Sequence, residues 1–444
     1  ILIKMRDVMT KENYQDVDDI IRMCRRRIRV PDQWYGDYLA TVGAARIGER
    51  RLKELVDRYG KDEIRQFIED WFAYSETMMV EAIKKLPAGT VSKTTVYDPM
   101  EPTLPKGLPI NVSVEIDPKN AKIEVDLTKN EDSKEFGLNE SVACATSNAL
   151  CGVFNCIDSD VPHNAGSFKR VSVKLRQGCV TGIPEFPLSC SMATTNIGDR
   201  IVNATQAAFA EFGKGYGLAE GSMGMGIGAA VISGKDKRFG GAPYINQEWL
   251  VVNGGPGTPT SDGWLNYGLP VAAGLMYRGS VEVEESKHPI LIKHMRVIPG
   301  GGGAGEFRGA PGADVMYGPR FDPMTVVTMC DAHINAPQGV QGGHSGPPAQ
   351  TYKIKACGTK EKLPGVSECE LQPGEWIQGF DAGGGGYGDP LDRDPCRVLK
   401  DVQQRWETLE RATDVYGVIL KSEQDALSID VDATEKERAR RRNQ

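Results

Sequence analysis

The chain has 444 residues, of which 40% are hydrophobic and 25% charged, as in a globular protein long enough for several domains. Its formal charge of −7 argues against a general nucleic-acid-binding protein, which needs a basic face. No apolar run approaches the roughly 20 residues of a membrane span, and ten cysteines without a C-x-x-C pair indicate reduced thiols in a cytoplasmic protein.

Residues 1–90 are predicted to form a hairpin of two long amphipathic helices. Apolar side chains recur every three or four residues over 52–59 and again over 64–86. Gly60 is suited to end the first helix and Pro87 to end the second.

Residues 91–214 are predicted to mix strands and helices. Alternating apolar residues at 110–116 and 123–127, joined by a turn sequence at 117–120, indicate a β-hairpin. A helix, a strand and a second helix are expected after it, at 140–157, 171–175 and 194–212.

Residues 215–390 are predicted to form a β-rich, glycine-rich domain, because short β-prone runs alternate with glycine and proline. The expected strands are 229–232, 249–252, 290–298, 314–317, 325–329 and 350–354. Residues 391–444 are predicted to form a helix over 391–420 and a frayed, charged tail. The fold class is therefore α+β.

Two motifs concern phosphate binding. Residues 300–305 read G-G-G-G-A-G, which matches G-x-G-x-x-G, but 307–312 cannot open the helix that a dinucleotide site requires. A structural turn is the favoured interpretation. No G-x-x-x-x-G-K-[ST] occurs, so the chain has no phosphate loop of this type.

Histidines offer the best candidates for catalysis. His333 follows a predicted strand, in a loop where functional residues often lie, and Asp331 is close enough in sequence to orient it. The alternative for His333 is an ordinary hydrogen-bonded loop histidine. His344 lies in the same glycine-rich region, which suggests a shared pocket.

Several segments together resemble one family. They are the helix with a Tyr-Gly stop at 48–60, Leu-Pro-Ala-Gly at 86–89, Asn-Ala-Gly at 164–166, Gly-Ala-Gly-Glu-Phe-Arg-Gly ending at 309, and Gly-Gly-Gly-Gly-Tyr-Gly-Asp-Pro at 383–390. In this order and spacing they resemble the hydantoinase B/5-oxoprolinase family, which includes the α-type subunits of acetone and acetophenone carboxylases. The segments at 30–40 and 44–46 favour the ketone carboxylases.

The resemblance implies a cytoplasmic multisubunit enzyme. ATP would bind an A-type ATPase partner subunit, and a divalent metal would bind an N-terminal half of the B-type subunit to which nothing here corresponds. The chain would then be the C-terminal part of a B-type subunit, with those two partners, a small carbonyl substrate and, in an acetone carboxylase, a small third subunit.

Three functions follow from the resemblance. The first is an ATP-dependent ketone carboxylase, in which an activated enol joins carboxyphosphate-derived CO2. The second is hydrolysis of a lactam or imide ring, and the third is a scaffold without catalytic groups. In the catalytic cases we expect the loops 300–305, 341–346 and 383–388 to wall a water-poor chamber, because glycine amides can approach phosphate closely. The candidate catalytic residues are His333 and Asp331, and the candidate substrate-binding residues are Asn164, His344, Gly384 and Gly385.

Overall fold

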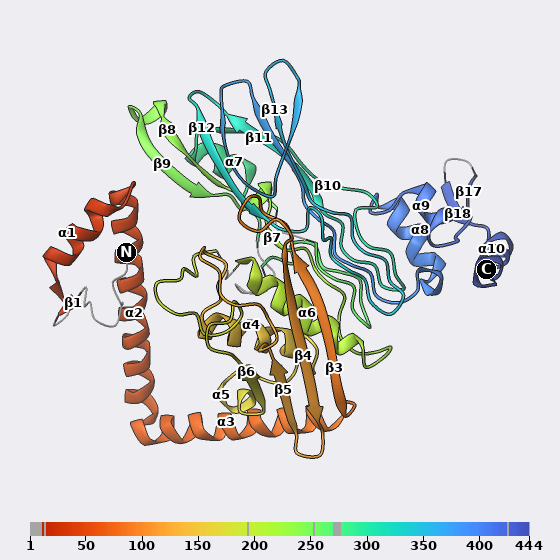
Figure 1. Ribbon diagram of the computed structural model, residues 1–444, viewed down its shortest axis with the longest axis horizontal. Coiled ribbons are helices and arrows are strands. Elements are labelled where there is room, and N and C mark those ends of the chain that lie inside the picture. The colour runs from red at the N-terminus through yellow and green to blue at the C-terminus, as the bar shows by residue number, and fades with distance from the viewer. Residues whose placement is uncertain are drawn as a thin grey trace.

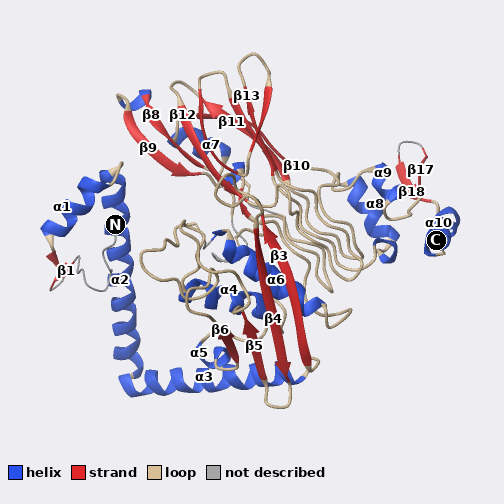
Figure 2. Ribbon diagram, viewed as in Figure 1, coloured by secondary structure: helices blue, strands red, loops and turns tan. Residues whose placement is uncertain are grey.

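A computed structural model describes residues 11–12, 15–192, 195–251, 254–269, 277–423 and 426–443. The predicted α+β class is confirmed: helices come first, β-rich sheets follow, and the last element is a helix (Figures 1 and 2). Among the described residues, no helix has both the length and the apolar character needed to cross a membrane.

The N-terminal arm consists of α1 (Asp18–Arg27), α2 (Pro31–Tyr59) and α3 (Lys61–Lys84). Pro31 occupies the first turn of α2, and Gly60 ends that helix with a φ of 87° that favours glycine. Both helices and the Gly60 stop were predicted correctly, but the hairpin was wrong. The helices α2 and α3 diverge at Gly60. Helix α3 runs along the base of the molecule, and α2 turns away from the rest of the molecule (Figure 1).

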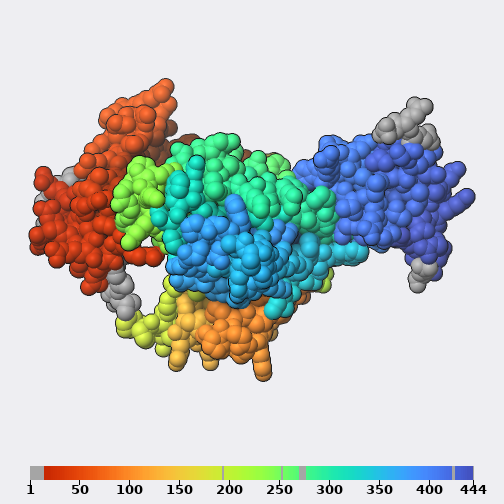
Figure 3. All heavy atoms as spheres, turned by 90° about the horizontal axis from the view of Figure 1, so that it is seen from above, coloured from red at the N-terminus to blue at the C-terminus, as the bar shows by residue number. Residues whose placement is uncertain are grey.

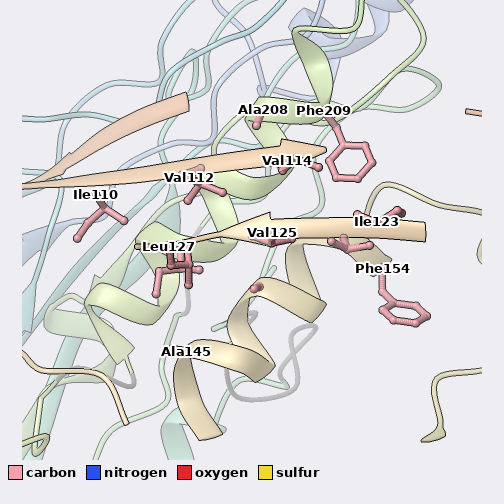
Figure 4. Close-up of a cluster of buried hydrophobic side chains, with 14 of the residues drawn as sticks. Ile110, Val112, Val114, Ile123, Val125, Leu127, Ala145, Phe154, Ala208 and Phe209 are labelled. Atoms are coloured by element: carbon pink, nitrogen blue, oxygen red, sulfur yellow. The ribbon is translucent and has the colours of Figure 1, made fainter. Parts of the chain in front are cut away.

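The first hydrophobic core lies between a four-stranded sheet and two helices. The sheet order is β3 (Gly89–Tyr97), β4 (Leu108–Asp117), β5 (Lys122–Asp126) and β6 (Val171–Lys174). Strands β4 and β5 form the predicted antiparallel hairpin, and β6 joins β5 in parallel. Helices α4 (Val142–Phe154) and α6 (Ile197–Ala210) are the predicted ones. Figure 4 shows side chains of β4, β5 and both helices meeting in this core.

Two further sheets form a β-rich layer above this core (Figure 2). One has the order β10 (Ile290–Val297), β11 (Ala313–Pro319), β16 (Trp376–Phe380), β13 (Gln350–Ile354) and β14 (Lys360–Leu363). The other has the order β15 (Val366–Leu371), β12 (Met324–Cys330), β8 (Val231–Asp236) and β9 (Ala242–Gln247), with β7 (Gly224–Met225) beside β12.

One predicted strand is absent from this layer. Residues 249–251 are irregular, and the end of the predicted run, Val252, lies outside the described residues. Leu250 is nevertheless completely buried, and its N–H donates to the carbonyl of Gly228. The apolar run reflects burial of a loop, which periodicity cannot separate from burial of a strand.

The glycine-rich loops pack side by side as a bundle, defined here as the glycine bundle: residues 254–257, 300–312, 337–347 and 383–388. Their parallel traces run between the β-rich layer and α8 in Figure 1. The central segment, 383–388, donates its backbone N–H groups to several neighbours. Gly383 and Gly386 donate to the 337–347 loop, and Gly384 and Tyr387 donate to the 300–312 loop, a spacing of three residues in both cases. The acceptors, in order, are Pro347, Ala310, Glu220, His344, Phe307 and Val340.

A three-residue repeat is typical of polyproline-II-like chains, which have no internal hydrogen bonds and can bond outward. Close packing then requires glycine. A Cβ on Gly384 would lie 2.0 Å from the carbonyl oxygen of Gly255, and one on Gly385 would lie 2.2 Å from that of Gln338. The four consecutive glycines are therefore needed because backbones surround this segment on several sides.

The C-terminal region forms a separate lobe, coloured blue in Figure 3. It contains α8 (Pro395–Gln403), α9 (Leu409–Asp414), the pair β17 (Leu420–Glu423) and β18 (Ala426–Ile429), and α10 (Val431–Arg442). The single helix predicted over 391–420 is thus broken. The predicted frayed tail was wrong, because Arg438 donates to the carbonyls of Tyr416 and Arg393 and fixes α10 to the lobe.

Candidate functional site

Asp331 follows directly after β12 and is the charged centre of a buried network. Its carboxylate accepts from Arg200 of α6 at 2.6 Å, and both side chains are almost completely inaccessible. Its other oxygen accepts from the backbone N–H groups of Asp98 and Ala332. Arg200 also donates to Thr95 of β3. Three separate parts of the fold are therefore joined at one ion pair.

Asp98 shapes the loop that carries His333. Its carboxylate accepts from the backbone N–H groups of His333, Ile334 and Asn335, and from the Asn335 side chain. Ala332 begins this loop with a φ of 64°, a conformation that costs free energy for a non-glycine residue. Such strain persists where surrounding contacts over-determine the backbone, and these hydrogen bonds supply those contacts.

His333 lies in this loop with its ring between β13 and the turn before β15. The Nε2 atom is 3.1 Å from Oγ1 of Thr351, and Nδ1 is buried without a hydrogen-bond partner. A proton on Nε2 would donate to Thr351 and leave a free lone pair on Nδ1. Burial lowers the pKa of His333, so the imidazole is neutral at pH 7.

A cavity of about 160 Å³ adjoins the ring of His333. Its volume suits a small molecule of a few heavy atoms. Polar and apolar groups share its wall, which is typical of ligand sites. The lining residues that carry polar side chains or aromatic rings are Tyr97, Asp98, Cys330, His333 and Lys362.

The structure brings Asp331 and His333 into one loop but gives them different partners. The Asp331 carboxylate is engaged by Arg200 and two backbone N–H groups, and the ring nitrogen of His333 contacts Thr351. The Asp331 carboxylate therefore contacts the backbone of the loop at Ala332, while Thr351 contacts the His333 ring.

The predicted substrate-binding residues lie elsewhere. Asn164 caps α5 (Ala165–Phe168): its side chain accepts from Gly166 and donates to Ser75 of α3. A Cβ on Gly166 would lie 2.0 Å from the carbonyl oxygen of Phe72, so this motif holds α5 close against α3. Asn164 thus has a helix-packing role in this fold.

His344, Gly384 and Gly385 belong to the glycine bundle rather than to the cavity beside His333. The side chain of His344 is exposed, and its backbone bonds to Ala304 and Gly386. The N–H groups of Gly384 and Gly385 donate to Ala310 and Glu220. These amides are already paired, which contradicts the expectation that they are free to meet phosphate.

Sequence reasoning missed a set of buried carboxylates near the start of α6. Burial raises the pKa of Glu140 to about 8, and neither of its carboxylate oxygens has a hydrogen-bond partner. Burial also raises the pKa of Asp199 to about 8, with a bond from the Gly224 N–H as the main opposing effect. Every residue of α6 is buried, so polar residues within an apolar helix pattern were the available signal.

Asp98 and Arg200 were also missed. Arg200 could have been found by the same signal, as a charge within a predicted buried helix. Asp98 could not be found from the sequence, because it is one of many acidic residues. Its hydrogen-bond partners lie more than 230 residues later in the chain. Among the described residues, no group of three or more His, Cys, Asp or Glu side chains is arranged to hold a metal ion.

The chain is similar to a known protein family over most of its length. The family model for hydantoinase B/oxoprolinase matches residues 1–390. The beta subunit of the Pseudomonas jessenii caprolactamase is 27% identical over 408 residues, covering 91% of this chain and 69% of that protein. The B-type subunit of a putative D-/L-hydantoinase from Pseudomonas sp. (strain NS671) is 28% identical over 452 residues, covering 97% and 71%.

The acetophenone carboxylase delta subunit of Aromatoleum aromaticum is 24% identical over 465 residues, covering 96% of this chain and 67% of that protein. Among solved structures, the ATP-dependent caprolactamase of Pseudomonas jessenii superposes with a TM-score of 0.84 at 25% identity, covering 97% of this chain and 74% of that one. Nucleotide-free acetone carboxylase has the same fold, with a TM-score of 0.84 at 17% identity, covering 98% and 63%.

Proposed function

The chain belongs to the hydantoinase B/oxoprolinase family, and from this premise we propose that it serves an ATP-dependent enzyme that hydrolyses a small cyclic amide. The observation that carries the proposal is its similarity, over nearly its whole length, to a caprolactamase subunit and a hydantoinase subunit. The chain would act as part of a B-type subunit, together with an ATPase subunit that supplies the phosphoryl group.

In this reaction ATP activates the amide oxygen of a lactam or imide, and water opens the ring. His333 is the proposed proton acceptor. Its imidazole is neutral at pH 7, and its unpartnered Nδ1 has the lone pair that a general base needs. Asp98 and Asp331 are proposed as positioning residues, because they fix the backbone on which the imidazole stands.

A ketone carboxylase is the second candidate. The sequence features at 30–40 and 44–46 favour it, and the acetophenone carboxylase delta subunit is a relative at 24% identity. The identity to the two amide-hydrolysing subunits is slightly higher, at 27% and 28%. We therefore rank the cyclic amide first.

The decisive experiment is purification of the chain with the subunits that accompany it, followed by measurement of ATP hydrolysis. The probes are caprolactam, hydantoin and 5-oxoproline as cyclic amides, and acetone and acetophenone with bicarbonate as ketones. We expect ADP and phosphate to form only with a cyclic amide, together with the ring-opened product. Bicarbonate-dependent turnover of a ketone would replace the first candidate by the second.

A variant of His333 distinguishes the scaffold alternative from a catalytic role for this chain. His333→Ala in the purified complex should abolish ring opening while the complex stays assembled. Full turnover in that variant, and also in Asp331→Asn, would favour the scaffold alternative over a catalytic role for this chain.

A further inference from the structure

A second cavity, of about 220 Å³, lies where β10 ends and β11 begins, and is named here the β10 cavity. The loop at 265–266 and Arg278, which precedes α7 (Val281–Lys287), complete its wall. No residue of this wall lines the cavity beside His333. The β10 cavity is therefore a second place in which a small molecule can be enclosed.

The polar side chains of this wall offer unused hydrogen-bond donors. Arg296 donates through Nε and Nη2 to the carboxylate of Asp314, at 2.9 and 2.7 Å, which fixes the plane of its guanidinium group. Its Nη1 has no acceptor in the described part of the chain, and the side chains of Asn266 and Arg278 have no hydrogen bond or ion pair there. A guanidinium group can only donate, so a ligand here must supply acceptors.

The β10 cavity is positively charged, although the whole chain has a formal charge of −7. Residues 263–281 and 286–305 carry most of its wall and contain no Asp or Glu. Asp314, which is bonded to Arg296, balances only one of the two guanidinium groups. The charge of Arg278 is left over, and it attracts an anion.

The rest of the wall is largely apolar and limits the size of that anion. Its apolar side chains are those of Val251, Leu265, Met295, Val297 and Pro311. The volume is smaller than the roughly 300–1,000 Å³ of sites for drug-sized ligands. Cationic and apolar groups together match a short hydrocarbon chain that carries a carboxylate, whereas inorganic phosphate has no apolar part to contact the second kind of group.

We propose that the β10 cavity binds a small organic carboxylate. Arg278 and the Nη1 of Arg296 hold the carboxylate, because a planar guanidinium group matches its geometry, and the Asn266 amide donates a further hydrogen bond. Asn266 has a φ of 52°, a conformation that costs free energy for a non-glycine residue and that recurs at ligand sites. Binding here does not depend on the reaction proposed for His333, so it can be measured on the full chain alone.

Titration calorimetry of the full chain with hexanoate and hexanamide provides the first test. The two probes share a hydrocarbon chain and differ in charge. Hexanoate should bind at least about 10-fold more tightly than hexanamide, because hydrogen bonds to a charged group are stronger than those to a neutral one. No binding of hexanoate, or equal affinity for the two probes, would overturn the proposal. Tighter binding of inorganic phosphate than of hexanoate would overturn the assignment to a carboxylate.

Variants locate the binding site. Arg278→Gln should weaken hexanoate binding at least about 10-fold without lowering Tm, since this side chain makes no hydrogen bond or ion pair to the described residues. Asn266→Gly removes the amide, keeps the positive φ and should weaken binding about 3-fold or more.

Two controls accompany these variants. Arg320→Gln makes the same charge change at an exposed arginine outside the wall, and His333→Ala alters the other cavity. Both should bind hexanoate as the wild type does. Unchanged binding in Arg278→Gln, or an equal loss in either control, would place the ligand elsewhere and refute the site.

Discussion

The guanidinium group of Arg200 donates to the carboxylate of Asp331 across 2.6 Å, and both side chains are almost fully buried. This ion pair links α6 to the loop after β12, and through the backbone of Asp98 it reaches the end of β3. The position of His333 therefore depends on contacts between segments that are distant in the sequence.

Asp331→Asn should lower the free energy of unfolding by about 3–5 kcal/mol, because the guanidinium of Arg200 is left as an uncompensated buried charge. Urea denaturation followed by circular dichroism measures this. Glu54→Gln, in the exposed pair with Arg51, is the control and should change stability by less than about 1 kcal/mol. An equally small effect of Asp331→Asn would refute a structural role for the buried pair.

His333→Gln in the assembled enzyme should lower kcat by about 100-fold or more, with little change in stability, if the imidazole is the proton acceptor. Because burial lowers the pKa of His333, activity should persist below pH 6.5 before it falls with protonation. The pH–rate profile of the wild type measures this acidic fall in activity. His344→Gln, whose side chain is exposed and lies in the glycine bundle, should retain wild-type turnover.

Glu140 should make the protein less stable at alkaline pH. Its pKa rises from 4.5 to about 8 on folding, so the folded state binds the proton more tightly than the unfolded state. The contribution of Glu140 to the free energy of unfolding is fully present below pH 4.5 and is lost as the pH rises through about 8.

Glu140→Gln should remove that pH dependence and raise stability at pH 9 by a few kcal/mol, an order-of-magnitude value from the size of the shift. Thermal denaturation between pH 5 and 9 measures this difference. Glu135→Gln, an exposed carboxylate five residues away, serves as the control. Parallel pH profiles for wild type and Glu140→Gln would contradict the prediction.

Gly384→Ala should disrupt the glycine bundle, because the new Cβ would lie 2.0 Å from the carbonyl oxygen of Gly255. The clash is with backbone atoms, which cannot shift as readily as the end of a side chain. We expect a loss of about 4 kcal/mol or more in the free energy of unfolding. The control is Gly36→Ala in α2, where nothing lies within 4 Å and the change should stabilise the helix by about 1 kcal/mol. Hydrogen exchange at 383–388 reports whether the bundle itself opens.

Elements with strong local signals were predictable. The hairpin of β4 and β5, the helices α3, α4 and α6, and the end of α2 at Gly60 all follow from apolar period and turn residues. Strands without such signals were missed: β14 (Lys360–Leu363) has an exposed, mostly charged sequence, and β16 (Trp376–Phe380) has glycine within it. Their pairing with neighbouring strands decides their conformation.

The candidate site was predictable only in part. The loop position of His333 after a strand was visible in the sequence, and so was the density of glycine at 383–388. The partners of those residues were not visible. Thr351 contacts the His333 ring from another strand, and Ala310 and Glu220 accept from the N–H groups of Gly384 and Gly385.

The α+β class, the family motifs and the local elements could be predicted from the amino-acid pattern, because they depend on residues a few positions apart. The divergence of α2 and α3, the pairing of Asp331 with Arg200, and the backbone partners of the glycine amides became visible in the folded molecule. These features depend on burial, which removes water as the alternative partner and makes each polar group bind whatever distant segment the fold brings to it.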